Sequence, residues 1–324
     1  MNILVTGGAG YIGSVTVSAL LQEGHEVTVY DSLVKGHPAA LPAGVRLVKA
    51  DIGDRDALQQ MLAGRSFEAV MHFAALIEPG ESMRRPDVYF ENNLCKSHTL
   101  IQQAVAHGVR RFILSSTAAV YASKDSPIEE QDRLQPANVY GQTKLMIEQM
   151  LEWYRLIHGL HYAALRYFNA SGAMPDRGEA HSPETHLIPL TLQVALGQRE
   201  VIEIYGTDYP TRDGTCIRDY IHVADLARAH VLAVEALEQS DRAVYNLGNG
   251  SGYSVREVID VARQVTGHPI PSVASQRRPG DAPILVASSE RISRDLGWQP
   301  QYPDLRTMVE TAWEWHRSHP YGYG

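Results

Sequence analysis

The chain has 324 residues, of which 44% are hydrophobic and 20% are charged, a composition typical of a globular protein with a sizeable core. Its net charge of -8 argues against a broad nucleic-acid or anionic-membrane surface, and no segment approaches the roughly 20 apolar residues that cross a bilayer. Two cysteines are too few for a disulfide framework and the first residues lack a signal-peptide pattern, so we expect a cytoplasmic protein.

Short β-branched runs alternate with helical periodicity over the first 170 residues. Strands are predicted near residues 2–6, 26–31, 45–49, 68–73, 110–115 and 162–167. Helices are predicted near residues 11–22, 54–63, 86–107 and 139–158. This order predicts an α/β fold with a doubly wound, Rossmann-type parallel sheet that carries helices on both faces.

The texture of the chain changes after Asn169, where loops rich in Gly, Pro, Asp and Thr surround shorter elements. We therefore expect a first domain at 1–171 and a smaller α/β lobe at 172–324. Part of 215–245 is expected to rejoin the first domain, because Arg218 to Ala236 has the pattern of a short strand followed by a helix.

The predicted helix 139–158 has more apolar surface than one core contact needs, which is a stripe of roughly 100°. Its two apolar arcs are Ile147, Leu151 and Tyr154, then Met146, Met150, Trp153 and Ile157. The second arc fits a homodimer interface shared with 86–107, and deeper burial within the same chain is the alternative.

A glycine-rich segment, Gly7-Gly8-Ala9-Gly10-Tyr11-Ile12-Gly13, follows the first predicted strand and opens the first predicted helix. Gly7 would supply the tight turn, Gly10 the close approach of a pyrophosphate, and Gly13 the packing of helix on sheet. Asp31 ends the second strand, where a carboxylate binds ribose hydroxyls and repels a 2'-phosphate. The pattern predicts a site for NAD, in which Asp51 and Ile52 flank the adenine; the alternative is an ordinary tight turn.

Tyr140 and Lys144 lie one helical turn apart, and Thr117 follows the fifth predicted strand. A phenol with a pKa near 10 is a poor base at neutral pH, and lowering that pKa to about 7 requires some 4 kcal/mol, which Lys144 and a positive nicotinamide would supply. Thr117 would bind a sugar hydroxyl and share the proton path with Tyr140, whereas Ser115 and Ser116 would satisfy only turn backbone. The alternative is a partly buried tyrosine beside a lysine whose stem packs on it.

The chain resembles the UDP-glucose 4-epimerases, a branch of the extended short-chain dehydrogenase/reductase family, over nearly its whole length. The matching segments are TGGAGYIGS at 6–14, Gly80-Glu81-Ser82, SSTAAVY at 115–121, Tyr140 to Lys144, Arg166-Tyr167-Phe168-Asn169, YGTDYPTRDGTCIRDYIHV at 205–223 and Arg277-Arg278-Pro279-Gly280-Asp281. The resemblance implies an NAD-binding first domain and a UDP-sugar-binding second lobe.

The same resemblance assigns further site residues. Besides the residues above, those for the cofactor are Tyr11, Ile12, Phe73, Ala74, Ala75, Asn93, Ser115, Tyr140, Lys144 and Tyr167. Those for the substrate are Thr117, Tyr140, Asn169, His186, Leu187, Tyr205, Arg218, Tyr220, Arg278, Asp281 and Leu285. In the family the two arginines hold the diphosphate, for which guanidinium geometry is well suited; an isolated Arg218 would otherwise pair with Asp219.

The implied activity is an isomerase reaction in which Tyr140 takes the O4 proton, C4 passes hydride to NAD, and the 4-keto sugar turns over before hydride returns. A 4,6-dehydratase or a UDP-glucuronate decarboxylase is the nearest alternative, but Ala118 and Ala119 replace the acid and base of a dehydratase. A non-catalytic NAD-sensing protein is the alternative from another class.

Four positions depart from the pattern of many family members, namely Ala122, Ile77, Thr117 and Leu285; Thr117 stands where some members have Ser and keeps the hydroxyl. Leu285 occupies the position that gates the 2-substituent of the sugar, and it leaves open the choice between glucose or galactose and their N-acetyl forms. The 14 histidines form no HExxH motif and no paired Cys/His spacing, so no metal is expected.

Overall fold

Seven parallel strands form the main sheet of the computed structural model, which describes residues 1–278 and 281–323. The strands stand in the order β10-β6-β5-β4-β1-β2-β3. Their bounds are β1 Asn2–Thr6, β2 Glu26–Asp31, β3 Arg46–Lys49, β4 Ala69–His72, β5 Arg111–Thr117, β6 His161–Tyr167 and β10 Arg242–Leu247. The six predicted strands are confirmed to within two residues at each end, and β10 adds a seventh from later in the chain.

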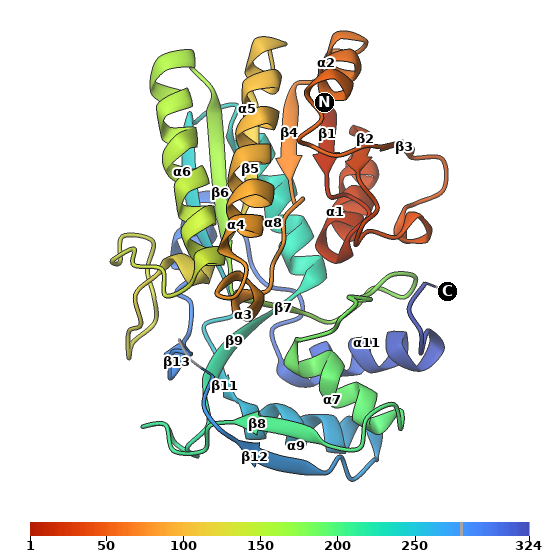
Figure 1. The fold of residues 1–324 in the computed structure, drawn as a ribbon, viewed down its shortest axis with the longest axis vertical. Coiled ribbons are helices and arrows are strands. Elements are labelled where there is room, and N and C mark those ends of the chain that lie inside the picture. The colour runs from red at the N-terminus through yellow and green to blue at the C-terminus, as the bar shows by residue number, and fades with distance from the viewer. Residues whose placement is uncertain (279–280, 324) are drawn as a thin grey trace.

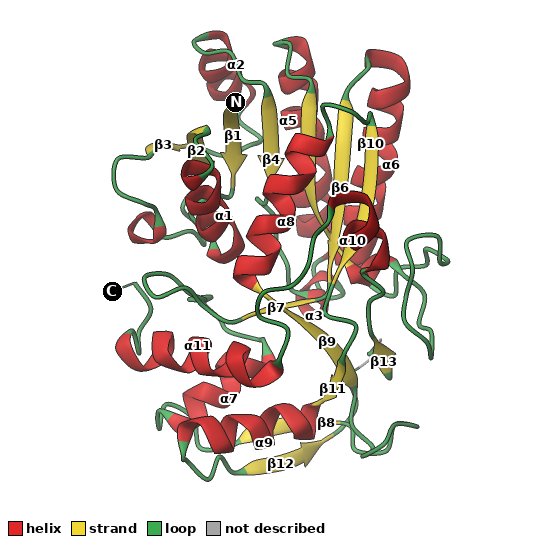
Figure 2. Cartoon of the chain, turned by 180° about the vertical axis from the view of Figure 1, so that it is seen from behind, coloured by secondary structure: helices red, strands yellow, loops and turns green. Residues whose placement is uncertain are grey.

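Helices cover both faces of this sheet, as Figures 1 and 2 show from opposite sides. One face carries α1 Tyr11–Gln22, α8 Val223–Ala236 and α10 Glu290–Leu296, and the other carries α2 Arg55–Ala63, α5 Lys96–Ala106 and α6 Val139–His158. Successive strand residues point to opposite faces, so Ile3 and Val5 join the core under α1 while Leu4 joins the core under α5. The doubly wound α/β prediction is confirmed.

The prediction of one continuous α-helix at 86–107 is wrong, because the segment is interrupted by a π-helical stretch. The segment consists of α4 Pro86–Tyr89, a π-helical stretch Phe90–Cys95, and then α5. The π-helical stretch contains Asn93, whose side chain forms hydrogen bonds with Leu76 in the loop after β4. Such local widening of a helix is common at functional sites.

The winding of the chain reverses between the central strand β4 and its neighbour β1. From β1 the chain winds outward through β2 and β3, and from β4 it winds the other way through β5, β6 and β10. The loops after these strands meet at one edge, where doubly wound sheets bind ligands. Those loops contain the short helix α3 Pro79–Ser82 and two 3-10 turns, Pro38–Ala40 and Ala118–Val120.

A second set of elements lies below that edge in Figure 1. A four-stranded sheet contains β7 Asn169–Ser171, β9 Ile217–His222, β11 Gly252–Ser254 and β13 Ile284–Leu285, and a parallel pair contains β8 Ile202–Tyr205 and β12 Ser272–Ser275. The helices α7 Leu187–Ala195, α9 Val255–Thr266 and α11 Leu305–Ser318 share one apolar core there. As predicted for residues 218–236, α8 follows β9 directly and packs on α1.

Among the residues described, no helix combines the length and the apolar character that crossing a bilayer requires.

Candidate active site

The turn between β1 and α1 can be built only from glycine at two positions. Gly7 has a φ of +70°, and a Cβ there would lie 2.4 Å from the backbone nitrogen of Ala74. A Cβ on Gly13 would lie 2.3 Å from the carbonyl oxygen of Gly7. The turn, the first turn of α1 and the loop after β4 therefore touch through bare backbone.

The first turn of α1 is open to an anion. Gly10 occupies the N-cap position, no side chain caps the helix, and a Cβ on Gly10 would meet nothing closer than an oxygen at 3.3 Å. The free N–H groups at Tyr11 and Ile12 and the positive end of the helix dipole suit a pyrophosphate. These features fit the cofactor that the sequence predicts.

Asp31 is held beneath this turn by backbone N–H groups. Its two carboxylate oxygens accept hydrogen bonds from Ala9 at 3.0 Å and from Leu33 at 2.8 Å, and the residue is buried. Leu33 has a φ of +60°, a strained conformation that persists where the surroundings require it. Each carboxylate oxygen keeps lone pairs for a ribose hydroxyl.

Asp51 follows β3, the strand next to β2, and it precedes buried Ile52. Its carboxylate accepts hydrogen bonds from Lys96 and from the Gly53 N–H, each at 2.7 Å. Burial raises the pKa of Asp51, but the Lys96 and Gly53 hydrogen bonds outweigh burial and lower it. Asp51 is therefore an ionised group tied to α5, a contact that its sequence neighbourhood does not indicate.

Asn93 links the loop after β4 to α6. The fully buried side chain accepts a hydrogen bond from the N–H of Leu76 at 2.8 Å and donates one to the carbonyl of Leu76 at 2.9 Å. It also donates to the hydroxyl of Thr143 at 3.3 Å. Asn93 therefore positions the loop of Phe73, Ala74 and Ala75, and Phe73 itself packs on His230 with ring centroids 4.8 Å apart.

The N-terminus of α6 places Tyr140. Asn138 caps the helix by accepting a hydrogen bond from the Gly141 N–H at 2.8 Å. The N–H of Tyr140 donates to the Ser82 hydroxyl at 3.1 Å, so α3 fixes the start of α6. A Cβ on Gly141 would lie 2.3 Å from the carbonyl oxygen of Ala119. Gly141 is therefore what lets the helix touch the turn that follows Thr117.

Burial acts in opposite directions on the two catalytic candidates of α6. Lys144 is 1% exposed and donates a hydrogen bond from Nζ to the Ser115 carbonyl at 2.7 Å. Burial lowers its pKa to about 8, although Glu148 acts to raise it. Tyr140 keeps some accessible surface, yet burial of its phenol raises the pKa to about 12, even though a hydrogen bond with Thr117 lowers it in part.

The two hydroxyl residues at the end of β5, Ser116 and Thr117, have different surroundings. Thr117 is buried and its Oγ accepts a hydrogen bond from the Ala119 N–H at 3.1 Å, which leaves its proton for another partner. Ser116 was expected to satisfy turn backbone, and this is wrong: its hydroxyl donates to Glu148. Glu148 in turn forms a buried ion pair with Arg166 at 2.6 Å.

Tyr167 is buried beside Ser115, and its hydroxyl is hydrogen-bonded to His230. Burial holds the pKa of this phenol well above its usual range, with Ser115 lowering it in part. The hydroxyl of Tyr167 therefore already has partners within the protein, and the neutral ring is what remains to contact a ligand.

The proposed substrate residues gather around β9. Strand pairing sets Asn169 of β7 opposite Tyr220, and Leu285 of β13 opposite Arg218. The guanidinium of Arg218 lies 3.6 Å from the Asp281 carboxylate. Leu285 also packs against the buried cluster that contains Ala118 and Phe168, so this strand pair reaches the turn after Thr117.

Arg218 does not pair with Asp219, the alternative that its sequence neighbour indicated. Asp219 is fully buried and accepts backbone N–H groups of Asn249, Gly250 and Ala287. Burial raises the pKa of Asp219 to about 6, although these N–H groups lower it in part.

Arg278 stacks on the Tyr205 ring, with the guanidinium carbon 3.9 Å from the ring centroid. This contact extends the guanidinium over a rigid surface, and a guanidinium that stacks on a ring can donate to an anion from its edge. Pro279 and Gly280, which belong to the matching motif, lie outside the described residues.

His186 is the last residue before α7, and Leu187 is the first residue of that helix. The Nδ1 atom of His186 lies 2.8 Å from carboxylate oxygens of both Glu179 and Glu184. The sequence did not reveal this cluster, because its members follow no standard metal or catalytic spacing.

Three comparisons place the chain among known proteins. The model of the NAD dependent epimerase/dehydratase family matches residues 3–248. A UDP-glucose 4-epimerase of Halalkalibacterium halodurans is 54% identical over 327 residues, with 100% of this chain and 98% of that protein covered.

Two solved structures are similar throughout. The UDP-glucose 4-epimerase of Brucella ovis in complex with NAD has a TM-score of 0.92 and 44% identity, covering 96% of this chain and 97% of that one. The UDP-glucose 4-epimerase of Bifidobacterium longum in complex with NAD+ and UDP has a TM-score of 0.95 and 35% identity, covering 99% of this chain and 100% of that one.

Proposed function

The chain belongs to the NAD dependent epimerase/dehydratase family, and from that premise we propose that it is a UDP-glucose 4-epimerase. It is an isomerase that interconverts UDP-glucose and UDP-galactose by inverting C4 of the hexose, with NAD as its cofactor. The observation that carries this conclusion is the contact at Gly141, which holds Tyr140 and Lys144 of α6 against the turn after Thr117.

The residues around the first turn fit NAD. Gly7, Gly10 and Gly13 leave room for a pyrophosphate at the uncapped start of α1, and Asp31 offers its carboxylate to a ribose. When bound, NAD supplies the acceptor for the C4 hydride and a positive charge at the nicotinamide. Asn93 holds the loop that would border the nicotinamide half.

Tyr140 acts in this proposal as the base that takes the proton from O4, and Thr117 binds the same oxygen. The protein alone keeps the phenol protonated, because burial raises its pKa to about 12. Bringing this pKa down to about 7 requires roughly 7 kcal/mol of preferential stabilisation of the phenolate. The Lys144 ammonium and the charge of the bound cofactor are the sources of that stabilisation, so Tyr140 becomes a base only when the site is loaded.

The UDP end of the substrate would be held by the residues around β9. Arg218 and Arg278 would clamp the diphosphate, with Asn169 beside it and Asp281 on the uridine ribose. The remaining substrate residues in this proposal are Tyr205, Tyr220, His186, Leu187 and Leu285. Firm contacts to the nucleotide and weak contacts to the hexose would let the 4-keto sugar present its other face for hydride return.

Related chemistries are less well supported. A dehydratase needs an acid and a base after Thr117, and Ala118 and Ala119 form only an apolar turn packed against α6. A protein that binds NAD without catalysis would not need the complete set of Thr117, Tyr140 and Lys144 that α6 and the turn after β5 bring together. Leu285 is compatible with a site that accepts only UDP-glucose and UDP-galactose and with one that also accepts their N-acetyl forms.

The division of the chain follows from these assignments as a proposal. Residues 1–171, rejoined by part of 215–245, would bind NAD, and residues 172–324 would bind the UDP-sugar. Both cysteines, Cys95 and Cys216, are free thiols, which supports the proposal of a reducing, cytoplasmic location.

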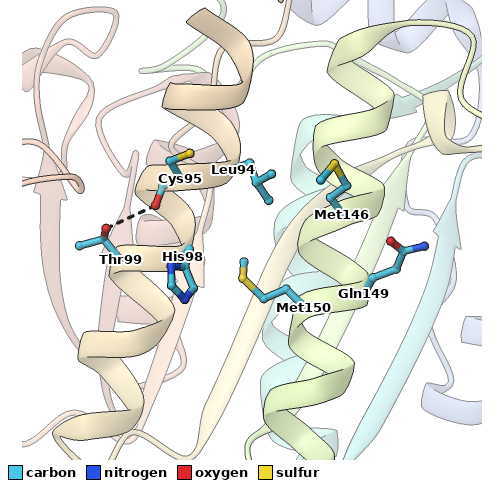
Figure 3. Close-up of a pocket in the computed structure, with 7 residues that line it drawn as sticks. All are labelled: Leu94, Cys95, His98, Thr99, Met146, Gln149 and Met150. Carbon is cyan, nitrogen blue, oxygen red and sulfur yellow. Dashed lines mark hydrogen bonds between the residues drawn. The ribbon is translucent and has the colours of Figure 1, made fainter. Parts of the chain in front are cut away.

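We also propose a homodimer formed through α5 and α6. A hollow of about 560 Å³ lies between these helices on their outer side, lined by Leu94, Cys95, His98, Thr99, Met146, Gln149 and Met150 (Figure 3). Farther along α6, Trp153, Leu156 and Ile157 are 64%, 57% and 67% exposed. Exposed apolar side chains that run along a helix pair, next to an apolar hollow, are typical of an interface between subunits.

The function is tested by mixing the purified protein with UDP-galactose, without added cofactor, and measuring UDP-glucose. The proposal predicts turnover by the wild type, and a 10²- to 10⁴-fold (roughly) lower rate for Tyr140→Phe, which loses the base but keeps all the other NAD-binding residues. Comparable turnover in Tyr140→Phe would remove Tyr140 from the mechanism, and no UDP-glucose from the wild type would contradict the proposed activity.

A further inference from the structure

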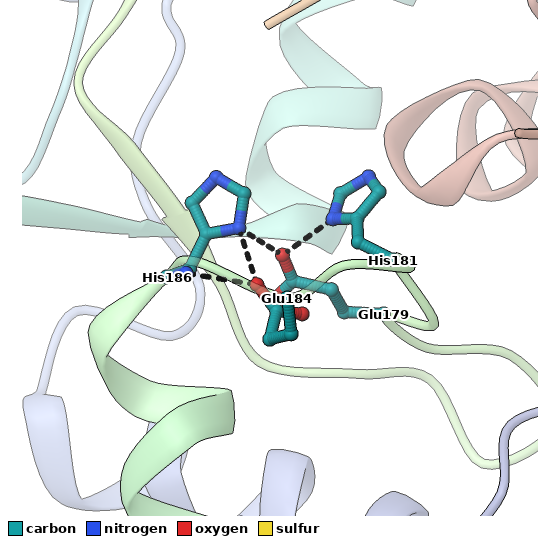
Figure 4. A group of neighbouring side chains, drawn as sticks. All are labelled: Glu179, His181, Glu184 and His186. Atoms are coloured by element: carbon teal, nitrogen blue, oxygen red, sulfur yellow. Dashed lines mark hydrogen bonds and ion pairs between the residues drawn. The ribbon is translucent and has the colours of Figure 1, made fainter. Parts of the chain in front are cut away.

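Four side chains from one short segment converge just before α7. Glu179, His181, Glu184 and His186 lie within eight residues, and one ligating atom of each falls within 4.8 Å of those of the other three (Figure 4). In this view both imidazoles point to the same carboxylate oxygen of Glu179, and His186 also contacts Glu184. Neither residue type stands in an HExxH spacing, so the sequence predicted no metal.

Three of the six distances between the ligating atoms are close to those of a coordination shell, and all six are within 4.8 Å. Nδ1 of His181 lies 2.9 Å from Oε1 of Glu179, and Nδ1 of His186 lies 2.8 Å from Oε1 of both Glu179 and Glu184. A tetrahedral ion with bonds of roughly 2.0–2.1 Å places its ligand atoms about 3.3 Å apart. An outward shift of about half an ångström would therefore turn these contacts into coordination bonds.

The charges also favour a cation at this centre. The side chains of Glu179 and Glu184 are each only 6% exposed. Among the residues described, the ion-pair partners of these two carboxylates are the two histidines alone. Burial lowers the pKa of both histidines, but Glu179 outweighs burial and raises it, so protonated imidazoles pair with the carboxylates when no ion is bound. One divalent cation would replace these protons and neutralise both carboxylates while it binds neutral imidazoles.

We propose that Glu179, His181, Glu184 and His186 form a structural site for one divalent transition-metal ion. Two imidazole nitrogens and two carboxylate oxygens match Zn²⁺ best, since this ion accepts both ligand types in tetrahedral geometry. Four protein ligands close the coordination shell, so the ion has no open position for substrate or water and takes no part in the chemistry. His186 would bind the ion through Nδ1, the atom that faces the carboxylates, and would keep its Nε2 for the substrate.

The contacts of the segment define what the ion would stabilise. The His181 ring meets the Tyr11 ring edge-on, with centroids 6.4 Å apart, at the start of α1. The Trp315 indole of α11 donates a hydrogen bond to the Glu179 carbonyl at 3.3 Å, and Thr185 donates to Glu78. A bound ion would therefore fasten α1, α11 and the loop before α3 to one another beside the cofactor turn.

The test measures metal bound by the untagged full-length protein. The chain is incubated with ZnCl₂, freed of loose metal by gel filtration and analysed by mass spectrometry of the element. The proposal predicts about one Zn²⁺ per chain in the wild type. His268→Ala is the control, because His268 is an exposed histidine that packs on Trp313 outside the cluster, and it should bind as much Zn²⁺ as the wild type. The Zn²⁺ content should be at least fivefold (roughly) lower in His181→Asn and in the double variant Glu179→Gln, His181→Asn.

Two further readouts complete the experiment. Zn²⁺ should raise the unfolding midpoint of the wild type by roughly 5 °C and leave that of His181→Asn unchanged, and Co²⁺ should give the visible absorption of a tetrahedral site only in the wild type and His268→Ala. His181 is near the surface, so its variant is expected to fold, as circular dichroism and retained NAD would verify. Equal metal content in wild type and His181→Asn, with no thermal shift, would overturn the proposal and identify the cluster as an ion-pair network.

Discussion

Tyr140 and Lys144 illustrate how burial opposes function at single residues. Burial favours the uncharged form of both groups, because it raises the pKa of the phenol to about 12 and lowers that of the amine to about 8. The reaction needs both charged forms, a phenolate and an ammonium. The site is thus built to become active only when a positive cofactor enters it.

Lys144→Met tests whether burial of the charged amine lowers the free energy of unfolding. In the unfolded chain Lys144 titrates near 10.5, and in the folded chain near 8, so between these values the unfolded state binds more protons and stability rises with pH. At pH 7 the amine is charged in both states and the full cost of burying it is present. Removing the amine should therefore help cofactor-free protein more at pH 7 than at pH 10, by roughly 2 to 3 kcal/mol.

The measurement is urea unfolding of cofactor-free wild type and variant at both pH values. Glu148 lies close to Lys144 and its charge reduces the effect without reversing it. The variant should also lose epimerase activity while it gains stability. An equal stability difference at the two pH values would show that Lys144 carries no burial cost.

Sequence patterns reach some of these residues and not others. Gly7, Gly13 and Asp31 could be inferred because strand, turn and helix follow one another directly along the chain. The roles of Ser82 and Asn93 depend on contacts with residues 58 and 50 positions away in sequence, Tyr140 and Thr143, which no local pattern records. The cluster at 179–186 is local, but its convergence depends on how the loop folds.

Among the elements, α6 determines the geometry of the site. Its first turn is fastened by the Asn138 cap, by the Ser82 hydroxyl and by direct contact with the turn at Ala119. The helix thereby sets the position of Tyr140 relative to Thr117, which comes from β5. A displacement of about 1 Å between such groups commonly costs about 100-fold in rate.

Gly141→Ala should displace the start of α6. The new Cβ would meet the Ala119 carbonyl oxygen at 2.3 Å, and a backbone atom cannot move aside as a flexible side chain can. We expect kcat to fall about 100-fold and the free energy of unfolding to fall by roughly 1–3 kcal/mol, with NAD still bound. Steady-state kinetics and denaturant unfolding measure both effects.

Gly80→Ala is the matched control, because its Cβ would meet nothing closer than Arg84 Nη1 at 3.8 Å. This variant should keep kcat within about threefold of the wild type, as surface changes with room to spare usually do. If Gly141→Ala were as active as Gly80→Ala, close approach of α6 to the turn would not matter for catalysis.

Element prediction succeeded where one periodicity sufficed. The six early strands and the helices α1, α2 and α6 follow their apolar patterns closely. The segment 86–107 has a helical pattern throughout, but apolar spacing cannot distinguish a π-helical stretch from an α-helix. Which lobe β9 and β10 would join was also beyond the pattern, since strand pairing depends on the whole fold.

For the whole molecule, the proposed dimer explains the apolar face of α5 and α6. Trp153→Glu places a charge at the exposed centre of that stripe, where it would be buried without a partner in a dimer. We expect sedimentation to give a dimer for the wild type and a monomer for the variant, with unchanged circular dichroism. Val273→Glu, at a 43% exposed position of β12, should remain dimeric. A monomeric wild type, or a dimeric Trp153→Glu, would contradict this interface.

In the proposed reaction the hydrogen on C4 leaves as hydride to a resident NAD and returns to the same carbon. The most direct test is to supply UDP-galactose deuterated at C4 to the purified protein in ordinary water and to examine the UDP-glucose formed by NMR and mass spectrometry. We expect UDP-glucose with an inverted C4 that retains its deuterium, whether or not unlabelled NAD is added. Loss of the deuterium to water would contradict it, because the carbon-bound hydrogen would then have left as a proton.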